Sequence, residues 1–179
     1  MDPVHYSRRV AVATTLVAGL WPRKPRAASL GHLVRHAAPR PMPDAAFQDD
    51  QGATVRLADF RGKALVLNLW ATWCAPCVAE MPSLQRLAGL VRQDGIMVLP
   101  LSSDRGGAEV VRAFYARLML KDLGIWIDPR GMATRSWGTR GLPTTLLIGR
   151  DGLERARLEG EANWSATDAV AQVRALLTR

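Results

Sequence analysis

The chain has 179 residues, of which 48% are hydrophobic and 22% charged, and its formal net charge is +8. This length and composition are typical of one ordinary globular domain, whose core forms without the dense disulfide framework of small secreted proteins. The first 43 residues hold seven basic residues against one acidic, and the remainder is nearly balanced, with 17 against 15. No basic stripe with interleaved aromatic residues follows, which excludes nucleic-acid binding.

The first 43 residues have the pattern of an export signal or N-terminal anchor. The pair Arg8-Arg9 precedes an uncharged run over residues 10–21, and further basic residues come after it. The run has the length of a signal-peptide core and is shorter than the roughly 20 residues of a membrane span. The arginine pair resembles a twin-arginine export signal. A short amphipathic or buried helix of a cytosolic protein is the alternative.

A proline-rich segment follows this signal. Pro39, Pro41 and Pro43 lie within "RHAAPRPMPD", and prolines at this spacing block both a helix and a central strand. We therefore predict a linker here, a domain boundary near Pro43 and a folded domain over residues 44–179.

Five strands and three helices are expected in this domain. Residues 53–57, after the turn signal at 50–52, form a strand of a leading hairpin. The apolar runs 64–70 and 95–102 are typical of buried parallel strands, and residues 144–149 and 153–160 flank a hairpin turn. Helices are expected at 75–91, 108–120 and 165–177, the last one capped by Ser165 with Asp168 in a capping box.

This order predicts an α/β protein. A parallel β–α–β half is followed by an antiparallel hairpin and a covering helix, which is a thioredoxin-like arrangement: a central mixed sheet flanked by helices. The leading hairpin is an N-terminal extension to it.

Both cysteines of the chain, Cys74 and Cys77, lie at the start of the first helix. A zinc site requires a second pair of ligands, and all three histidines lie within the first 43 residues. Covalent haem attachment requires a histidine at the position of Val78. A disulfide that closes a loop of only two residues constrains the unfolded chain very little, so a purely structural disulfide is also excluded. A redox couple without metal or cofactor remains.

The position of the pair suggests a role for each thiol. The positive end of the helix dipole favours the thiolate of Cys74, and Pro76 is tolerated in the first turn. Cys77 lies one turn further in, where it can attack a mixed disulfide formed on Cys74. We therefore expect Cys74 to be the nucleophile and Cys77 the resolving thiol.

These motifs resemble the thioredoxin superfamily. "WCAPC", Pro82 and "GLPTT" (141–145) carry the resemblance, and "LNLWATWCAPCVAEMPSL" is similar to the exported TlpA/ResA/DsbE-like branch. The resemblance implies that Pro143 is cis and faces the cysteines, and that the backbone of Leu142 pairs with a bound substrate strand. Trp73 is then a partner-contact surface. From the residues alone, Pro143 is also compatible with a simple loop-to-strand proline.

Glu80 is the candidate for proton transfer to Cys77. Cytosolic thioredoxin has a buried aspartate six residues before its first cysteine, where this chain has Asn68, which cannot exchange a proton at neutral pH. Glu80 lies three residues after Cys77 on the same helix face and matches the glutamate of W-C-x-P-C-x-x-E. The alternative is a solvated helix glutamate.

Three functions follow from these observations. The first is a monomeric thiol-disulfide oxidoreductase in the periplasm or at the outer face of the cytoplasmic membrane, either released or tethered by its N-terminus. By resemblance it takes electrons from a membrane thiol donor and reduces cysteines of apocytochrome c or metal chaperones. The second is a thiol peroxidase, although its T-x-x-C motif is missing because Thr72 is two residues before Cys74. The third is a non-catalytic binding module.

Overall fold

Strand β4 (Ala64–Trp70) is the centre of the sheet, and all seven of its residues are buried. The computed structural model describes residues 30–178. In this range the sheet has eight strands in the order β1-β8-β7-β4-β5-β6-β2-β3. Strands β4, β5 and β6 are parallel, and β7, β8 and β1 continue the sheet in antiparallel pairs on the other side of β4.

The other strands are β1 (Leu33–Arg40), β2 (Ala46–Gln48), β3 (Thr54–Arg56), β5 (Ile96–Ser102), β6 (Trp126–Ile127), β7 (Thr144–Ile148) and β8 (Glu154–Glu159). The α-helices of the described range are α1 (Ala75–Val91), α2 (Gly107–Leu118), α3 (Met132–Ser136) and α4 (Thr167–Leu177). Short 3₁₀ helices are η1 (Leu57–Phe60) and η2 (Arg92–Asp94). This is the predicted α/β, thioredoxin-like architecture.

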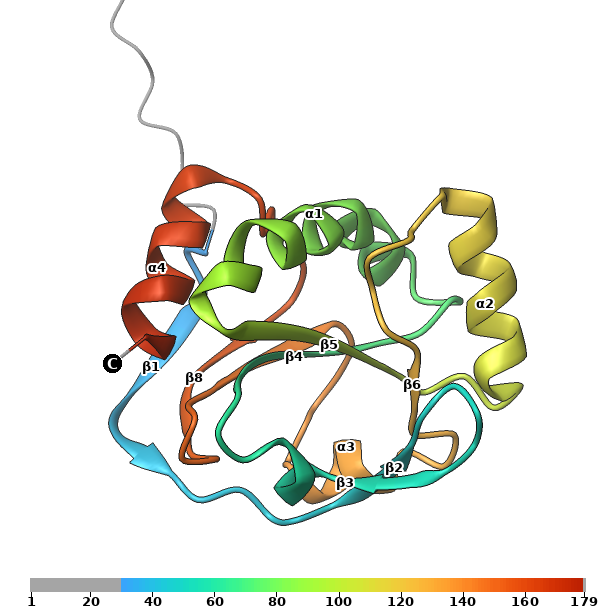
Figure 1. Ribbon diagram of the computed structural model, residues 1–179, viewed down its shortest axis with the longest axis horizontal. Coiled ribbons are helices and arrows are strands. Elements are labelled where there is room, and N and C mark those ends of the chain that lie inside the picture. The colour runs from blue at the N-terminus through green and yellow to red at the C-terminus, as the bar shows by residue number, and fades with distance from the viewer. Residues whose placement is uncertain (1–29, 179) are drawn as a thin grey trace, which may run out of the picture.

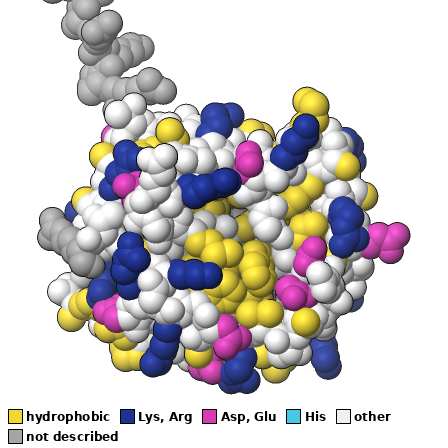
Figure 2. Space-filling view, viewed as in Figure 1, with side chains coloured by type: hydrophobic (Ala, Val, Ile, Leu, Met, Phe, Trp, Pro, Cys, Tyr) yellow, Lys and Arg dark blue, Asp and Glu magenta, His cyan; other side chains and the backbone are white. Residues whose placement is uncertain are grey.

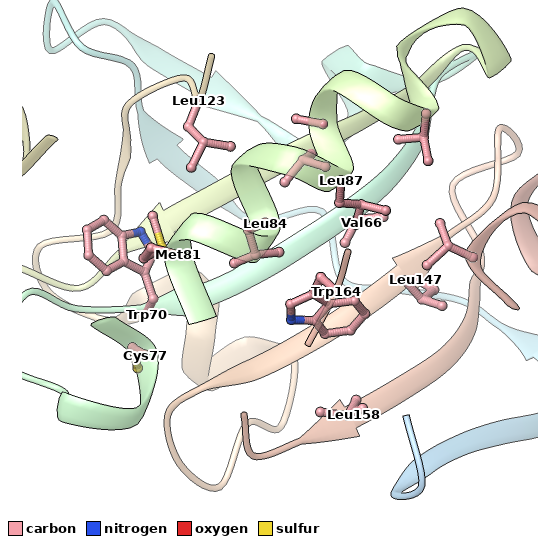
Figure 3. Close-up of a cluster of buried hydrophobic side chains, with 14 of the residues drawn as sticks. Val66, Trp70, Cys77, Met81, Leu84, Leu87, Leu123, Leu147, Leu158 and Trp164 are labelled. Atoms are coloured by element: carbon pink, nitrogen blue, oxygen red, sulfur yellow. The ribbon is translucent and has the colours of Figure 1, made fainter. Parts of the chain in front are cut away.

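Two hydrophobic cores lie on opposite faces of the sheet. Alternate side chains of β4 point to opposite faces, as in any strand, so Val66 and Trp70 enter one core and Leu65 and Leu67 the other. Helices α1 and α4 cover the first face, and α3 lies on the second (Figure 1). Figure 3 shows the first core, in which Cys77 lies beside Met81 and Trp70. The inner cysteine is thereby part of the packed interior.

The surface of the folded part carries charges of both signs. On the face shown in Figure 2, hydrophobic side chains gather in one central region and basic and acidic side chains surround it. Within the described residues no helix is both long and apolar enough to cross a membrane.

The leading hairpin is present: β2 and β3 pair in antiparallel register, and β2 also pairs with β6. Strand β6 and helix α3 were not expected from the sequence. β6 has two residues and α3 has five, which is too short for either periodicity to show.

The proline-rich segment differs from its prediction. Residues 33–40 are not a linker but strand β1, which pairs antiparallel with β8, Leu33 opposite Leu158. An edge strand tolerates proline because one of its sides needs no hydrogen bonds. Pro39 therefore fits in β1, and the folded part already includes the buried Leu30. The expected export signal at residues 8–26 lies outside the described residues.

The predicted cap of the last helix is also wrong. Helix α4 begins at Thr167 after Ala166, with no side-chain cap. The hydroxyl of Ser165 instead donates to Asn163 and accepts a hydrogen bond from Arg86. Ser165 thus ties the loop before α4 to helix α1.

If residues 30–40 belong to the folded unit, Leu30→Ala in the full chain should lower the free energy of unfolding by about 2–5 kcal/mol, as for other buried leucines. Val34→Ala is the matched control, because Val34 is 62% exposed and should change stability by less than about 0.5 kcal/mol. Denaturant unfolding measures both. Equal, negligible effects would mean that this segment is a linker after all.

Candidate active site

Cys74 and Cys77 form a disulfide at the N-terminus of helix α1. The S–S distance is 2.08 Å and the Cα atoms are 5.2 Å apart. Cys74 is the N-cap residue, and its Sγ accepts a hydrogen bond from the backbone N–H of Cys77 at 3.4 Å. An N-cap side chain that accepts such a bond lies where unpaired backbone N–H groups and the helix dipole favour negative charge. The outer sulfur therefore occupies the position that stabilises a thiolate.

The two sulfurs differ in their access to solvent. Cys74 is 7% exposed and Cys77 is completely buried. Trp73, next to Cys74, is 69% exposed, whereas Trp70 is buried in the core. A partner can therefore reach Cys74 alone, with Trp73 as the neighbouring contact.

Leu142 and Pro143 lie in the chain just before strand β7. The Leu142–Pro143 peptide bond is cis, as the resemblance implied. Leu142 and Trp73 line the same groove. The backbone carbonyl of Pro143 accepts a hydrogen bond from Gly160. Neither backbone group of Leu142 has a partner within residues 30–178. These groups are thus available to another chain.

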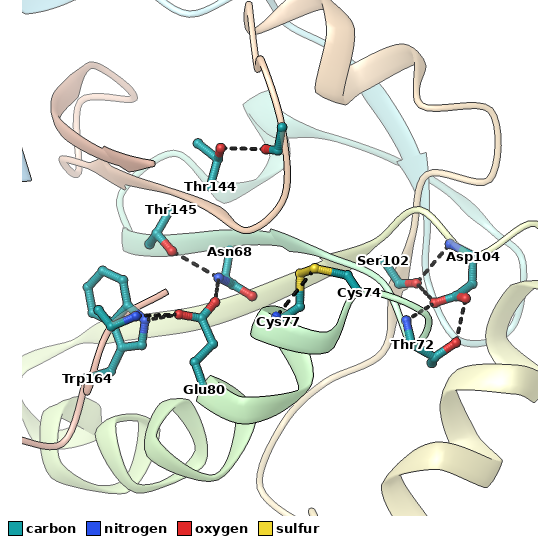
Figure 4. Close-up of a disulfide and its surroundings, with 12 residues drawn as sticks. Asn68, Thr72, Cys74, Cys77, Glu80, Ser102, Asp104, Thr144, Thr145 and Trp164 are labelled. Carbon is teal, nitrogen blue, oxygen red and sulfur yellow. Dashed lines mark hydrogen bonds between the residues drawn. A yellow bond between two sulfur atoms is a disulfide. The ribbon is translucent and has the colours of Figure 1, made fainter. Parts of the chain in front are cut away.

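Asp104 holds the loop that leads into the cysteines. Its carboxylate accepts hydrogen bonds from the backbone N–H of Thr72 at 2.9 Å, from the Thr72 hydroxyl at 2.7 Å and from the Ser102 hydroxyl at 2.6 Å (Figure 4). Asp104 is 4% exposed. Because it follows β5, which is parallel to β4, it reaches the same edge of the sheet as the cysteines. That placement, and not a motif, is the signal that could have identified it.

Glu80 is buried, not solvated. Its Oε1 accepts a hydrogen bond from the Asn68 side chain at 2.8 Å (Figure 4). Its Oε2 accepts from the indole Nε1–H of Trp164 at 2.9 Å and from the backbone N–H of Ala162 at 3.1 Å. The predicted candidate is therefore held rigidly between helix α1, strand β4 and the loop before α4. In the disulfide state neither carboxylate oxygen of Glu80 forms a hydrogen bond with a cysteine sulfur.

Burial raises the pKa of Glu80 from its ordinary value of 4.5 to about 7, and the hydrogen bonds from Trp164 and Asn68 oppose part of that rise. Desolvation dominates because the charged form loses more hydration than these donors restore. A carboxyl group with this pKa can both accept and release a proton near neutral pH.

Asn68 connects Glu80 to the disulfide region. Its Nδ2 donates to both Glu80 and Thr145, the latter at 2.9 Å. Its Oδ1 is buried and has no hydrogen-bond partner among the described residues. Figure 4 shows this oxygen on the side that faces the disulfide. An acceptor thus lies unused beside the cysteines in their oxidised state.

The structure pairs Cys74 with the buried Cys77, places Trp73 and Leu142 in the wall of one groove, and buries Glu80 in helix α1. No local pattern identifies Trp164 or Thr145 as partners of this site, because both come from distant parts of the chain. Within the described residues no cluster of His, Cys, Asp or Glu could hold a metal ion.

A thioredoxin-like fold with a Cys-x-x-Cys pair at a helix N-terminus defines a thiol-disulfide oxidoreductase. Residues 39–156 match the model of the AhpC/TSA family, and the chain belongs to this family. It is 34% identical over 119 residues to the thiol-disulfide oxidoreductase ResA of Bacillus thuringiensis subsp. konkukian, covering 66% of this chain and 68% of that protein. The ResA of Geobacillus thermodenitrificans is 32% identical over 118 residues, or 66% and 67% of the two chains.

A solved structure supports the same class of protein. A protein of Chlorobium tepidum, assigned as a thiol:disulfide interchange protein DsbE, superposes with a TM-score of 0.68 at 26% identity, over 77% of this chain and 96% of that one.

Because the pKa of Glu80 is higher in the folded protein than its ordinary value, the folded state binds more protons between pH 4.5 and 7. The wild type should therefore lose stability as pH rises through this window. Glu80→Gln cannot titrate, so its stability relative to wild type should rise by up to roughly 3 kcal/mol from pH 4.5 to 8. Denaturant unfolding of the oxidised proteins at both pH values measures this difference. Glu109→Gln, at an exposed helix position, is the control, and a pH-independent difference for Glu80→Gln would contradict the raised pKa.

Proposed function

We propose that this protein reduces disulfide bonds of partner proteins outside the cytoplasm. The observation that carries the proposal is the redox pair itself, in which Cys74 is 7% exposed, Cys77 is completely buried, and Trp73, next to Cys74, lines a groove with Leu142. Every group that a disulfide reductase requires is present there: an accessible nucleophile, a shielded second thiol and a contact surface.

The reaction proceeds in two exchanges. In the dithiol form the Cys74 thiolate attacks one sulfur of the partner's disulfide, forms a mixed disulfide and releases the first partner thiolate. Cys77 then loses its proton and attacks the Sγ of Cys74, which forms the intramolecular disulfide and releases the second partner thiolate. The partner gains two electrons, and the protein ends in the disulfide state.

The location and the physiological partners belong to the same proposal. The basic, apolar and basic pattern of residues 8–26 supports export by a twin-arginine-like route, with the N-terminus either cleaved or kept as a tether. A membrane thiol protein would return electrons to the disulfide. The similarity to ResA and DsbE supports partners that are themselves exported, such as apocytochrome c or proteins that assemble metal centres.

Thiol peroxidase chemistry finds no support in the geometry. Thr72 is the threonine nearest to Cys74 in sequence, and its hydroxyl donates to Asp104. The Thr72 hydroxyl is therefore used in a structural hydrogen bond and is not available to activate a peroxide.

Cys77→Ser in the full chain should accumulate mixed disulfides with partner proteins through Cys74, because the second exchange is blocked. Cys74→Ser should trap almost none, since Cys77 is completely buried. Non-reducing gels of the exported fraction measure the adducts. The wild type should also reduce insulin with a dithiol donor and consume hydrogen peroxide no faster than Cys74→Ser does. The proposal fails if peroxide is consumed and insulin is not reduced.

Glu80 is the proposed proton acceptor for Cys77 in the second exchange. A pKa of about 7 makes its carboxylate available at neutral pH. Asn68 lies between Glu80 and the disulfide in Figure 4 and can orient the carboxylate through its 2.8 Å hydrogen bond. Glu80 also borders a surface hollow of about 480 Å³, which provides a way for the proton to reach solvent.

We expect Glu80→Gln to reduce a protein disulfide more slowly, by up to about 10²-fold, the lower end of the usual range for lost general-base catalysis. The wild-type rate should rise through pH 7 as Glu80 ionises, and this step should be absent from the variant. The deficit should shrink at high pH, where Cys77 ionises unaided. Stopped-flow measurement of single-turnover reduction gives both profiles. Glu109→Gln should behave as wild type, and equal profiles for Glu80→Gln and wild type would exclude the role.

A further inference from the structure

A groove at Trp73, the residue before Cys74, is lined by arginines. Its volume is about 690 Å³, and Trp73 and Leu142 form part of its wall. No aspartate or glutamate is among the described residues that line it. The basic residues that line this arginine groove are Arg105, Arg130, Arg135 and Arg140.

These four guanidinium groups have no anionic partner within residues 30–178. Arg135 donates a side-chain hydrogen bond to the sulfur of Met132 at 3.2 Å. Some exposed arginines elsewhere on the fold do pair with an aspartate, for example Arg56 with Asp44 at 2.7 Å and Arg174 with Asp94 at 2.8 Å. The arginine groove therefore offers its cations to whatever enters it.

Two aspartates lie close to the groove in sequence, but neither neutralises it at the surface. Asp104 is buried and bonded to Thr72 and Ser102. Asp128 is also buried and accepts hydrogen bonds from Thr134 and the backbone of Met132. Both carboxylates face inward, one holding the loop at Thr72 and the other the start of helix α3, so the groove is positive where a partner would meet it.

The wall of the groove also indicates the shape of its occupant. The N–H and C=O of Leu142 are unpaired in the described structure, and only Pro143 separates Leu142 from strand β7. An extended peptide can therefore form backbone hydrogen bonds to Leu142 while one of its sulfurs reaches Cys74. Residues on either side of that sulfur would then lie against the arginines.

We propose that the arginine groove selects partner disulfides whose cysteine is flanked by aspartate or glutamate. The inference rests on the proposed function and names its substrate class. Guanidinium groups suit this task because their planar donors pair with carboxylates and keep their charge at every physiological pH. Complementary charge near a reacting sulfur raises the rate of encounter, and salt weakens the effect.

Three synthetic peptides test the proposal. Each contains one intramolecular disulfide, and they differ only in the residues that flank one cysteine: Asp/Glu, Asn/Gln or Lys. The second-order rate constant for their reduction by the reduced full chain is measured at low ionic strength and at about 1 M salt, where the Debye length is about 3 Å. We expect the acidic peptide to react about tenfold faster than the basic one at low salt, and within about twofold of it at high salt.

Matched variants assign the preference to the groove. Arg130→Gln/Arg135→Gln should bring the acidic-to-basic rate ratio at low salt down to about two or three. Arg61→Gln/Lys63→Gln removes the same charge from the turn before β4, at the opposite end of that strand from Cys74, and should keep the wild-type ratio. Because a change in the reactivity of Cys74 would alter all rates alike, the ratio reports recognition only.

The outcomes separate this proposal from the proposed function. If the neutral peptide is not reduced, the proposed function is wrong. If it is reduced but the acidic and basic peptides react at equal rates, or if both double variants change the ratio equally, the arginine groove does not select acidic partners.

Discussion

The complete burial of β4 is the constraint on which the rest of the structure depends. A strand buried along its whole length requires partners on both edges and cover on both faces, which here are β5, β7 and the two cores. Asn68 is the one strongly polar side chain in this strand, and burial of its amide is tolerated because Glu80 and Thr145 accept hydrogen bonds from it. The buried carboxyl group in turn requires donors, which Trp164 and Ala162 supply. The environment of the redox pair thus follows from the hydrogen bonds that the buried polar side chain of the central strand requires.

This chain of hydrogen bonds also explains how the site obtains a group that titrates near neutral pH without histidine. All three histidines of the sequence lie before residue 37, whereas the cysteines begin at Cys74. Burial shifts the pKa of Glu80 into the range that histidine usually covers, while three donors keep the carboxylate accessible to ionisation. Full desolvation without donors would hold the group neutral, and exposure would leave it ionised. Burial and hydrogen bonding together give Glu80 a pKa of about 7, at which its carboxylate can accept a proton.

The sequence predicted the parts of the fold that depend on local patterns and missed those that depend on distant partners. β4 and α1 were predicted with their observed limits because a continuous apolar run and a helical periodicity are local properties. β1 was taken for a linker because its prolines argue against a central strand, and nothing local shows that β8 leaves an edge free for it. Ser165 has the pattern of a cap but bonds to Asn163, since the loop is held by Arg86 of another helix. The burial of Glu80 depends in the same way on Trp164, 84 residues away.

The charge of the active-site surface likewise depends on where the fold places charged side chains, and not on the net charge of the chain. The near balance of 17 basic and 15 acidic residues after position 43 gives no reason to expect a strongly positive surface there. The fold nevertheless turns two aspartates of the active-site edge inward, where they hold the loop at Thr72 and the first turn of helix α3 at Thr134, and leaves the neighbouring arginines outside. A net charge is a sum over the whole chain, whereas a partner responds to the potential within about a Debye length of its contact. The local field beside Cys74 is therefore a property of the fold, created by which carboxylates the loops need for their own hydrogen bonds.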